Sequence, residues 1–164
     1  MRLSSYLEHT QAGVGNGTVG RIFFGDMLLY EQASLLTAYS NEFVLTVKAG
    51  EVLTMELGCV GDVGFDYSAF SMSIESTNWA ILADTYTDFS GVQDATPGGW
   101  QYGHFSGATF TTSGWSCGGA SWAGPETYLS ISSDQGHPGN SGGSMVCRWT
   151  CSHSGTLHIN GRFM

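Results

Sequence analysis

The segment 134–143, DQGHPGNSGG, holds the residues whose spacing is most suggestive of chemistry. A serine followed by two glycines, as at Ser141, can present its hydroxyl on a tight loop. A hydroxyl on such a loop is a candidate nucleophile, and His104 and His137 are the histidines to consider as its base. A cluster of Gly, Ser, Asn and Pro is equally typical of an ordinary loop between strands.

This segment resembles the nucleophile loop of chymotrypsin-like serine proteases, and the following SMVC at 144–147 resembles the strand after that loop. The resemblance implies that Ser141 is the nucleophile and that the backbone N–H groups of Ser141 and Gly139 stabilise the oxyanion. It also implies a His and an Asp upstream, on strand ends of a first barrel with an Ala-Ala-His-Cys type signature. His9 lies near the chain start and His104 lies in a Gly-rich segment, so neither has that context. A two-barrel protease also needs a longer chain. Serine hydrolysis is therefore the alternative, and an ordinary loop is the favoured interpretation.

Aromatic residues gather in the Gly-rich second half of the chain. Aromatic rings on loops stack on sugar rings, and nearby Asp, Asn and Gln side chains can bond sugar hydroxyls. The rings of a lectin-like surface would be those of Trp100, Tyr102, Trp115 and Trp122, with Trp149 as a further candidate. The side chains that bond the sugar hydroxyls would be those of Asp94, Gln101 and Asn140. The other interpretation, which we favour, is that the tryptophans fill the sandwich core or a subunit interface, where aromatics dominate the energetics.

The four cysteines are Cys59, Cys117, Cys147 and Cys151. On one strand Cys147 and Cys151 would stand about 13 Å apart, at about 3.3 Å per residue. That span exceeds the Cα limit of about 7 Å for a disulfide. We therefore expect two disulfides, each joining one of this pair to Cys59 or Cys117. Buried free thiols, or a zinc site that adds His153, are the alternatives, although the chain has no Cys-x-x-Cys.

Carboxylates offer two further kinds of site. Loop oxygens could bind a structural calcium ion at Asp84, Asp88 and Asp94, or at Asp62 and Asp66. Their spacing is irregular, so solvated loop ends are the favoured interpretation, and no metal or cofactor is predicted. No pair of glutamates is placed convincingly for glycoside hydrolysis, and the residues to test would be Glu51, Glu56 and Glu75.

Composition excludes several classes of partner. Charged residues make up 12% of the 164-residue chain, the net charge is −9, and the five Lys and Arg lie far apart. No basic stripe exists to neutralise phosphates, which argues against nucleic acids and anionic membrane surfaces. No apolar run approaches the ~20 residues of a transmembrane helix. The start of the chain lacks the apolar core of a secretory signal.

The fold is predicted from alternation, which is clearest at residues 42–57. Phe43, Leu45 and Val47 share one parity before Ala49-Gly50, and three further apolar residues alternate after it. This pattern predicts a β-hairpin with one buried face. Other expected strands lie within 21–30, 65–75, 79–86, 105–112, 128–131, 145–149 and 156–164, while 31–39 is the most helix-like window.

About eight to ten strands, with turns every 8–12 residues, predict an all-β, single-domain antiparallel β-sandwich of jelly-roll type with at most one short helix. Residues 1–19 are expected to form an N-terminal arm, flexible or docked on a partner, with a possible helix near Ser4 or Ser5. Residues 20–164 would form the sandwich domain.

The strings FVLTVKAGEVLTMEL and GTLHINGRF resemble the opening and closing strands of small extracellular jelly-roll modules of the pre-peptidase C-terminal type. This resemblance covers about a third of the chain, implies the fold, and carries over no functional residue. The favoured prediction is a non-enzymatic module, extracellular or on a virion surface, that acts in assembly or adhesion through its Trp- and Gly-rich loops. Its partners would be further copies of itself, other surface proteins or glycans. A carbohydrate-binding domain and a Ser141 hydrolase are the alternatives.

Overall fold

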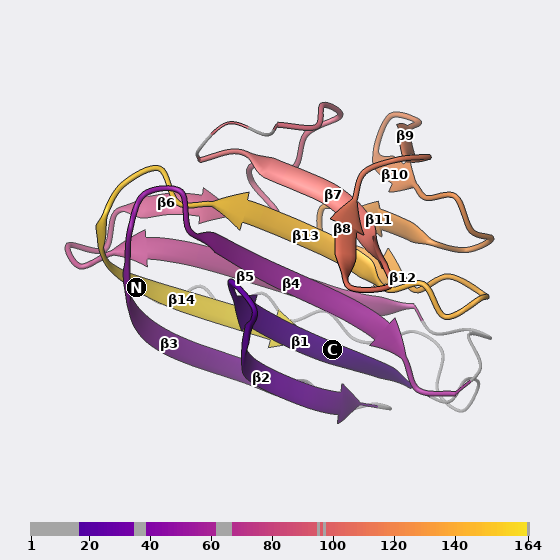
Figure 1. Cartoon of the computed structure of the whole chain (residues 1–164), viewed down its shortest axis with the longest axis horizontal. Helices are drawn as coiled ribbons and strands as arrows, with labels where there is room; N and C mark the ends of the chain where they lie inside the picture. The colour runs from indigo at the N-terminus through magenta and orange to yellow at the C-terminus, as the bar shows by residue number, and fades with distance from the viewer. Residues whose placement is uncertain (1–16, 35–38, 62–66, 95, 97, 164) are drawn as a thin grey trace.

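The computed structural model of the chain describes residues 17–34, 39–61, 67–94, 96 and 98–163. These residues form fourteen strands and no helix. The strands make two antiparallel sheets that pack face to face (Figure 1). The predicted antiparallel β-sandwich is therefore confirmed. The strand count exceeds eight to ten because several expected loops contain strands of two or three residues.

The expected arm and helix near the chain start fall mostly outside the described residues, which begin at residue 17. The first strand begins at Thr18, two residues before the predicted start of the sandwich domain. Within the described part of the chain, no helix has the length and apolarity needed to cross a membrane.

The six-stranded sheet has the strand order β2-β1-β4-β13-β7-β8. Its strands are β1 (Thr18–Phe24), β2 (Met27–Ser34), β4 (Val52–Cys59), β7 (Trp100–Ser106), β8 (Thr109–Thr111) and β13 (Met145–Thr150). Strand β4 is central and buried from Leu53 to Gly58. β1 and β2 form a hairpin around Gly25 and Asp26, with a register shift after Ile22. The sequence of 21–30 indicates either a buried strand pair or one bulged strand; the structure has the pair, although Met27 and Leu28 of β2 are exposed.

The second sheet has the order β3-β14-β5-β12-β11-β10-β9, with β6 paired to β5. Its strands are β3 (Tyr39–Val47), β5 (Ser68–Ser76), β6 (Ile81–Asp84), β9 (Ser116–Cys117), β10 (Ser121–Ala123), β11 (Ser130–Ser132), β12 (Gln135–His137) and β14 (Gly155–Phe163). The short strands β9, β10 and β11 gather at one end of the molecule, beside β7 and β8 (Figure 1).

The core lies between the two sheets and follows the alternation of each strand. On β5 and β14, every second residue is buried. Glycines let the sheets approach closely: a Cβ on Gly20 would meet the ring of Phe163, and a Cβ on Gly161 would meet the side chain of Ile22. A large residue from one sheet therefore fills the space left by a glycine of the other.

The hairpin predicted over residues 42–57 is wrong in its pairing. β3 pairs with β14, whereas β4 pairs with β1 and β13, so the two strands belong to different sheets. The turn itself is tight: Gly50 has φ 89°, and the Glu51 N–H donates to the Lys48 carbonyl at 3.1 Å. Alternation shows that each strand has a buried face, but two facing strands of a sandwich give the same pattern as a hairpin.

Three other segments differ from the sequence expectations. The helix-like window 31–39 contains the end of β2 and the first residue of β3, and its residues 35–38 lie outside the described part. The sequence indicates a loop or a sheet edge over 114–124 and a loop over 132–144, and these segments contain the short strands β9, β10 and β12. Tertiary pairing decides the conformation of such short segments, since their local patterns are weak.

Candidate functional site

Two exposed aromatic residues have an unusual backbone. Trp79 has φ 63° and Tyr128 has φ 70°, and among the described residues they are the non-glycine residues with positive φ. The left-handed region costs an L-residue roughly 1–2 kcal/mol, and strained conformations cluster at functional sites. Their side chains are also 62% and 64% exposed. The chain therefore keeps two large rings in solvent at a cost in backbone energy.

The conformation of Trp79 is set by the turn between β5 and β6. The Trp79 N–H donates to the Ser76 carbonyl at 2.8 Å, and the Ser76 N–H donates to the Ala80 carbonyl at 2.9 Å. The Ser76 hydroxyl also donates to the side-chain oxygen of Asn78. These bonds close the turn tightly and direct the Trp79 ring back over the sheet, where its centroid lies 4.5 Å from that of His158.

Beneath this ring, one row of side chains crosses the outer face of four strands. In order across β3, β14, β5 and β6, the row is Val44, His158, Glu75 and Ile81. Val44 and Ile81 are 58% and 65% exposed. We call Trp79 with Val44, His158 and Ile81 the Trp79 patch. It is an apolar surface with Glu75 at its centre.

A second aromatic group lies at the other end of β5. Gly136 faces Met145 of the six-stranded sheet, so the next residue, His137, turns to the outer side. The rings of Tyr67 and Tyr128 lie 5.2 and 5.4 Å from the His137 ring. Both tyrosines are exposed, while His137 is buried beneath them. We call Tyr67, Tyr128 and His137 the Tyr128 patch.

The two patches share the outer face of the eight-stranded sheet, which we call the aromatic face. Between them, the outward positions of β5 are small: Ala69, Ser71 and Ser73. Ser71 lies opposite Arg162, and Ser73 lies between Asn160 and Asp84 in the register. The span from Ala69 to Glu75 is about 20 Å at about 3.3 Å per residue. On the aromatic face, the outward residues of β5 between the two ring clusters are therefore small.

The predicted sugar-binding aromatics are mostly in the core. Trp100, Tyr102 and Trp122 are at most 6% exposed, and Trp149 is 1% exposed. The rings of Tyr102 and Trp122 stack at 5.9 Å. The half-buried Trp115 donates its indole N–H to His104 Nδ1 at 2.9 Å. Core packing, the interpretation favoured from the sequence, describes four of these five residues.

The predicted polar helpers do not converge on those rings at the surface. Asp94 accepts hydrogen bonds from the backbone N–H and hydroxyl of Thr96, which hold the pKa of its carboxyl below the usual value. Gln101 is half-buried on β7 opposite Arg148. Asn140 is exposed on the loop after β12.

The loop around Ser141 encloses a carboxylate of its own chain. Glu126 Oε2 accepts the N–H groups of Ser141 at 3.0 Å and Gly143 at 3.3 Å. The Gly139 N–H donates to the Gly143 carbonyl at 2.7 Å. Both backbone donors predicted for an oxyanion hole are thus already engaged. A Cβ on Gly139 or Gly143 would collide with Glu126, which gives these glycines a structural role.

Neither histidine proposed as the base is bonded to Ser141 in the described part of the chain. His137 Nδ1 donates to the Pro138 carbonyl at 2.6 Å, and His104 Nδ1 accepts from Trp115. The Ser141 hydroxyl lies 3.4 Å from the side-chain oxygen of Asn140. This arrangement lacks the nucleophile–base pair on which the hydrolase alternative depends.

No disulfide joins any two of the four cysteines, all of which lie in the described part of the chain. The two predicted disulfides are therefore wrong for this structure. Cys147 and Cys151 are buried thiols, and burial raises the pKa of both, that of Cys151 to about 11. Cys117 is half-buried, and Cys59 Sγ lies 3.8 Å from the Gly61 carbonyl. The zinc alternative finds no support, since no metal-binding cluster occurs among the described residues.

The candidate calcium ligands are engaged in local turns. Asp84 Oδ1 accepts the N–H groups of Tyr86 and Thr87, and Asp88 Oδ2 accepts the N–H of Asp84. Asp62 and Asp66 lie outside the described residues. Among the glutamates, Glu51 accepts the Lys48 N–H at 2.7 Å, Glu75 belongs to the aromatic face, and Glu56 lies on the opposite sheet.

No family model, curated protein or solved structure matches the chain. The class of protein is therefore described from its fold and surface alone. It is an antiparallel β-sandwich with exposed, strained aromatic residues on the outer face of one sheet.

Sequence reasoning missed Trp79, Tyr128, Tyr67 and His158 as surface residues. One signal was present, because Thr77 and Asn78 are turn-forming residues directly before Trp79. A residue in a turn is outside the inward and outward alternation of the strands, so a large aromatic side chain there is not directed into the core. The ring contacts with His158 and His137 could not be foreseen, since they join segments distant in sequence.

Proposed function

We propose that this chain is a non-enzymatic β-sandwich module that acts in assembly or adhesion, outside a cell or on a virion. We propose further that the aromatic face is its contact surface and that its partner in assembly is a second copy of the chain. The observation that carries this proposal is the pair of exposed rings at Trp79 and Tyr128, each held at positive φ.

An apolar patch with a polar rim is typical of a protein contact surface. The Trp79 patch exposes three apolar residues together, Trp79, Val44 and Ile81, although Glu75 lies in the same row. Tryptophan and tyrosine are the residues that most often dominate binding energy at such surfaces. The strain at Trp79 is consistent with a role that folding alone does not require.

Carboxylates lie within and beside the patch: Glu75 lies inside its row, Glu42 lies on β3, Asp84 on β6 and Asp88 after it. Two copies that meet through this face bring like charges together, and the chain as a whole has a net charge of −9. Salt screens such repulsion. Self-association through the aromatic face should therefore strengthen as salt increases, whereas association with a basic partner should weaken.

The test is light scattering coupled to size-exclusion chromatography over a range of protein and salt concentrations. We expect concentration-dependent self-association that increases between about 50 and 500 mM NaCl, where the screening length falls several-fold. Trp79→Ser should abolish it. Val92→Ser is the matched control, because Val92 is 68% exposed but lies in the segment after β6, outside the two patches. A monomer under every condition would contradict the proposal of self-assembly.

Carbohydrate binding is the second candidate, and the small outward residues of β5 favour it. These side chains leave room for a flat ligand, the flanking Asn160, Arg162 and Asp84 are groups that bond hydroxyls, and a ring cluster lies at each end. Glycan-array binding that is lost in both Trp79→Ser and Tyr128→Ser, and that is insensitive to salt, would favour this function. Array silence would remove it.

A further inference from the structure

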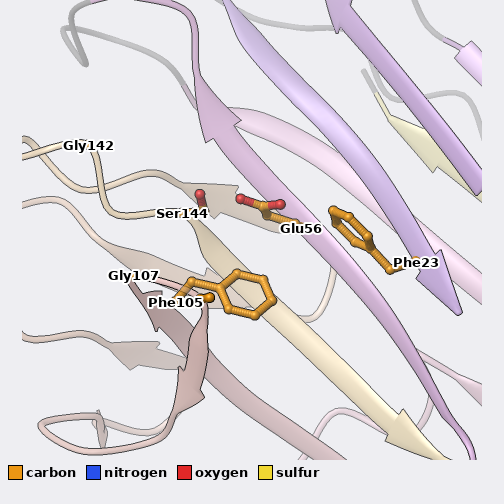
Figure 2. A pocket seen from close by; sticks show the side chains of 7 residues that line it. Phe23, Glu56, Phe105, Gly107, Gly142 and Ser144 are labelled. Carbon is orange, nitrogen blue, oxygen red and sulfur yellow. The ribbon is translucent and has the colours of Figure 1, made fainter. Parts of the chain in front are cut away.

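The outer face of the six-stranded sheet, opposite the aromatic face, holds a pocket of about 430 Å³. Its lining comes from β1, β4, the β7–β8 hairpin and the loop before β13, and comprises Phe23, Glu56, Phe105, Gly107, Ala108, Gly142 and Ser144. Figure 2 shows the Glu56 carboxylate between the Phe23 ring and Ser144, with the Phe105 ring across from it. The pocket thus has two aromatic walls and one ionisable residue.

Glu56 is unusual because it is a carboxylate on the outward side of a strand with only 7% exposure. Its neighbours in the register are Arg21 on β1 and Val146 on β13. A buried carboxylate needs strong partners, since its desolvation is costly. The contact that the structure gives it is with Arg21 Nη1, at 3.3 Å from Glu56 Oε1.

Arg21 is shared between two carboxylates. Its Nε lies 2.6 Å from Glu31 Oε2, so its closer partner is Glu31 rather than Glu56. The three side chains together carry one net negative charge. Among the described residues, no hydrogen bond reaches Glu56 Oε2. The pocket therefore contains a carboxylate whose charge is only partly balanced.

A second cation on this face, Arg148, is directed elsewhere. The Arg148 guanidinium lies 5.1 Å from the centre of the Phe110 ring, and Phe110 packs where Gly103 leaves space for it. Arg148 does not line the pocket. The Ser144 hydroxyl, which does, can accept a hydrogen bond as well as donate one. The pocket is thus suited to a ligand that is cationic, apolar at its flanks and able to donate hydrogen bonds.

We infer that this pocket binds an alkylammonium group, with Glu56 as the counter-ion and Phe23 and Phe105 as the aromatic walls. Carboxylates bind ammonium groups through charge-assisted hydrogen bonds, and aromatic faces attract cations through their quadrupole. The group could belong to a free amine or to a lysine side chain of another protein, because both present the same chemistry. This site is independent of the aromatic face and of the function proposed for it.

The test is an NMR titration of the whole chain with n-butylammonium and with butan-1-ol, which has a similar size but no charge. We expect n-butylammonium to shift the amide signals of Gly107, Ala108 and Gly142 in a saturable way, and to bind at least about tenfold more tightly than the alcohol. N-acetyl-lysine methylamide distinguishes the source: binding as tight as that of n-butylammonium indicates a lysine side chain, and much weaker binding indicates a free amine.

Glu56→Gln should weaken n-butylammonium binding at least about tenfold, because it removes the charge-assisted bond. Phe105→Leu should weaken it about three- to tenfold, since it keeps an apolar wall but removes the ring. Asp26→Asn is the matched charge control, because Asp26 lies at the exposed β1–β2 turn and should leave the affinity unchanged. Equal affinity for the amine and the alcohol, or full affinity in folded Glu56→Gln or Phe105→Leu protein, would overturn the inference.

Discussion

Two tryptophans of this chain lie in opposite environments. Trp149 on β13 is 1% exposed and lies opposite Trp100 on β7, within the core. Trp79 follows a turn, is 62% exposed and has φ 63°. The first buries its large apolar surface with an unstrained backbone, and the second exposes that surface with a strained one. The difference teaches that residue type alone does not tell whether an aromatic ring packs in the core or stays in solvent, whereas its exposure and its backbone conformation do.

The largest expected contrast between these tryptophans is in stability. Trp149→Ala should lower the free energy of unfolding by about 3–5 kcal/mol, because it removes a fully buried ring and leaves a cavity. Trp79→Ala should change it by no more than about 0.5 kcal/mol, as is usual for surface positions. Urea denaturation followed by circular dichroism measures both.

Comparable losses in the two variants would break the contrast, since Trp79 would then belong to the fold rather than to a contact surface. Val92→Ala, at an exposed apolar residue outside the patches, sets the baseline for a surface truncation.

The pH dependence of stability tests a second buried residue of this region, Cys151, which directly follows β13. Burial raises the pKa of Cys151 from 9.0 to about 11, so the folded protein holds this proton more tightly than the unfolded chain. The resulting stabilisation is complete below pH 9 and is lost as the pH rises to about 11. The loss should be on the order of 2 kcal/mol, and denaturation at several pH values measures it.

Cys151→Ala isolates this thiol, because tyrosines and lysines also titrate in the alkaline range. The variant should show a shallower decrease in unfolding free energy than the wild type between pH 9 and 11. Identical pH profiles for the two proteins would contradict the buried position of Cys151.

The smallest expected effect concerns the strain itself. Trp79→Gly should raise the free energy of unfolding by up to about 1 kcal/mol, because glycine adopts positive φ without the steric cost, offset in part by its greater freedom when unfolded. Tyr86→Gly is the control, since Tyr86 is also exposed but is not among the described residues with positive φ. It should lower stability by about 0.5–1 kcal/mol, and the same sign for both substitutions would argue against strain at Trp79.

Much of the fold was predictable because alternation is a local property. The two-residue periods of β5 and β14 predict strands with one buried face, and the structure has both. Pairing is not local, and for this reason the hairpin over residues 42–57 was wrong: Val47 and Leu53 face the same core from different sheets.

Less of the candidate site was predictable. A Gly-rich setting made Trp100 and Trp122 look like loop residues, yet their strands turn them inward. Trp79 was expected to begin a strand over 79–86, but the strand is β6 (Ile81–Asp84) and Trp79 lies in the turn before it. Its backbone angle and its contact with His158 could not be predicted, since they exist only after folding. The carboxylate bound by the Ser141 loop comes from Glu126, fifteen residues earlier, and no local motif marks that pairing.

The most direct test of the aromatic face combines association and stability in one variant, Trp79→Gly. Its sedimentation behaviour and its urea denaturation would be compared with those of the wild type in the same buffer. We predict that self-association is lost while stability is kept or increased, because the proposed contact needs the ring and the backbone conformation costs energy. Retained association, or a loss of several kcal/mol in stability, would contradict this account.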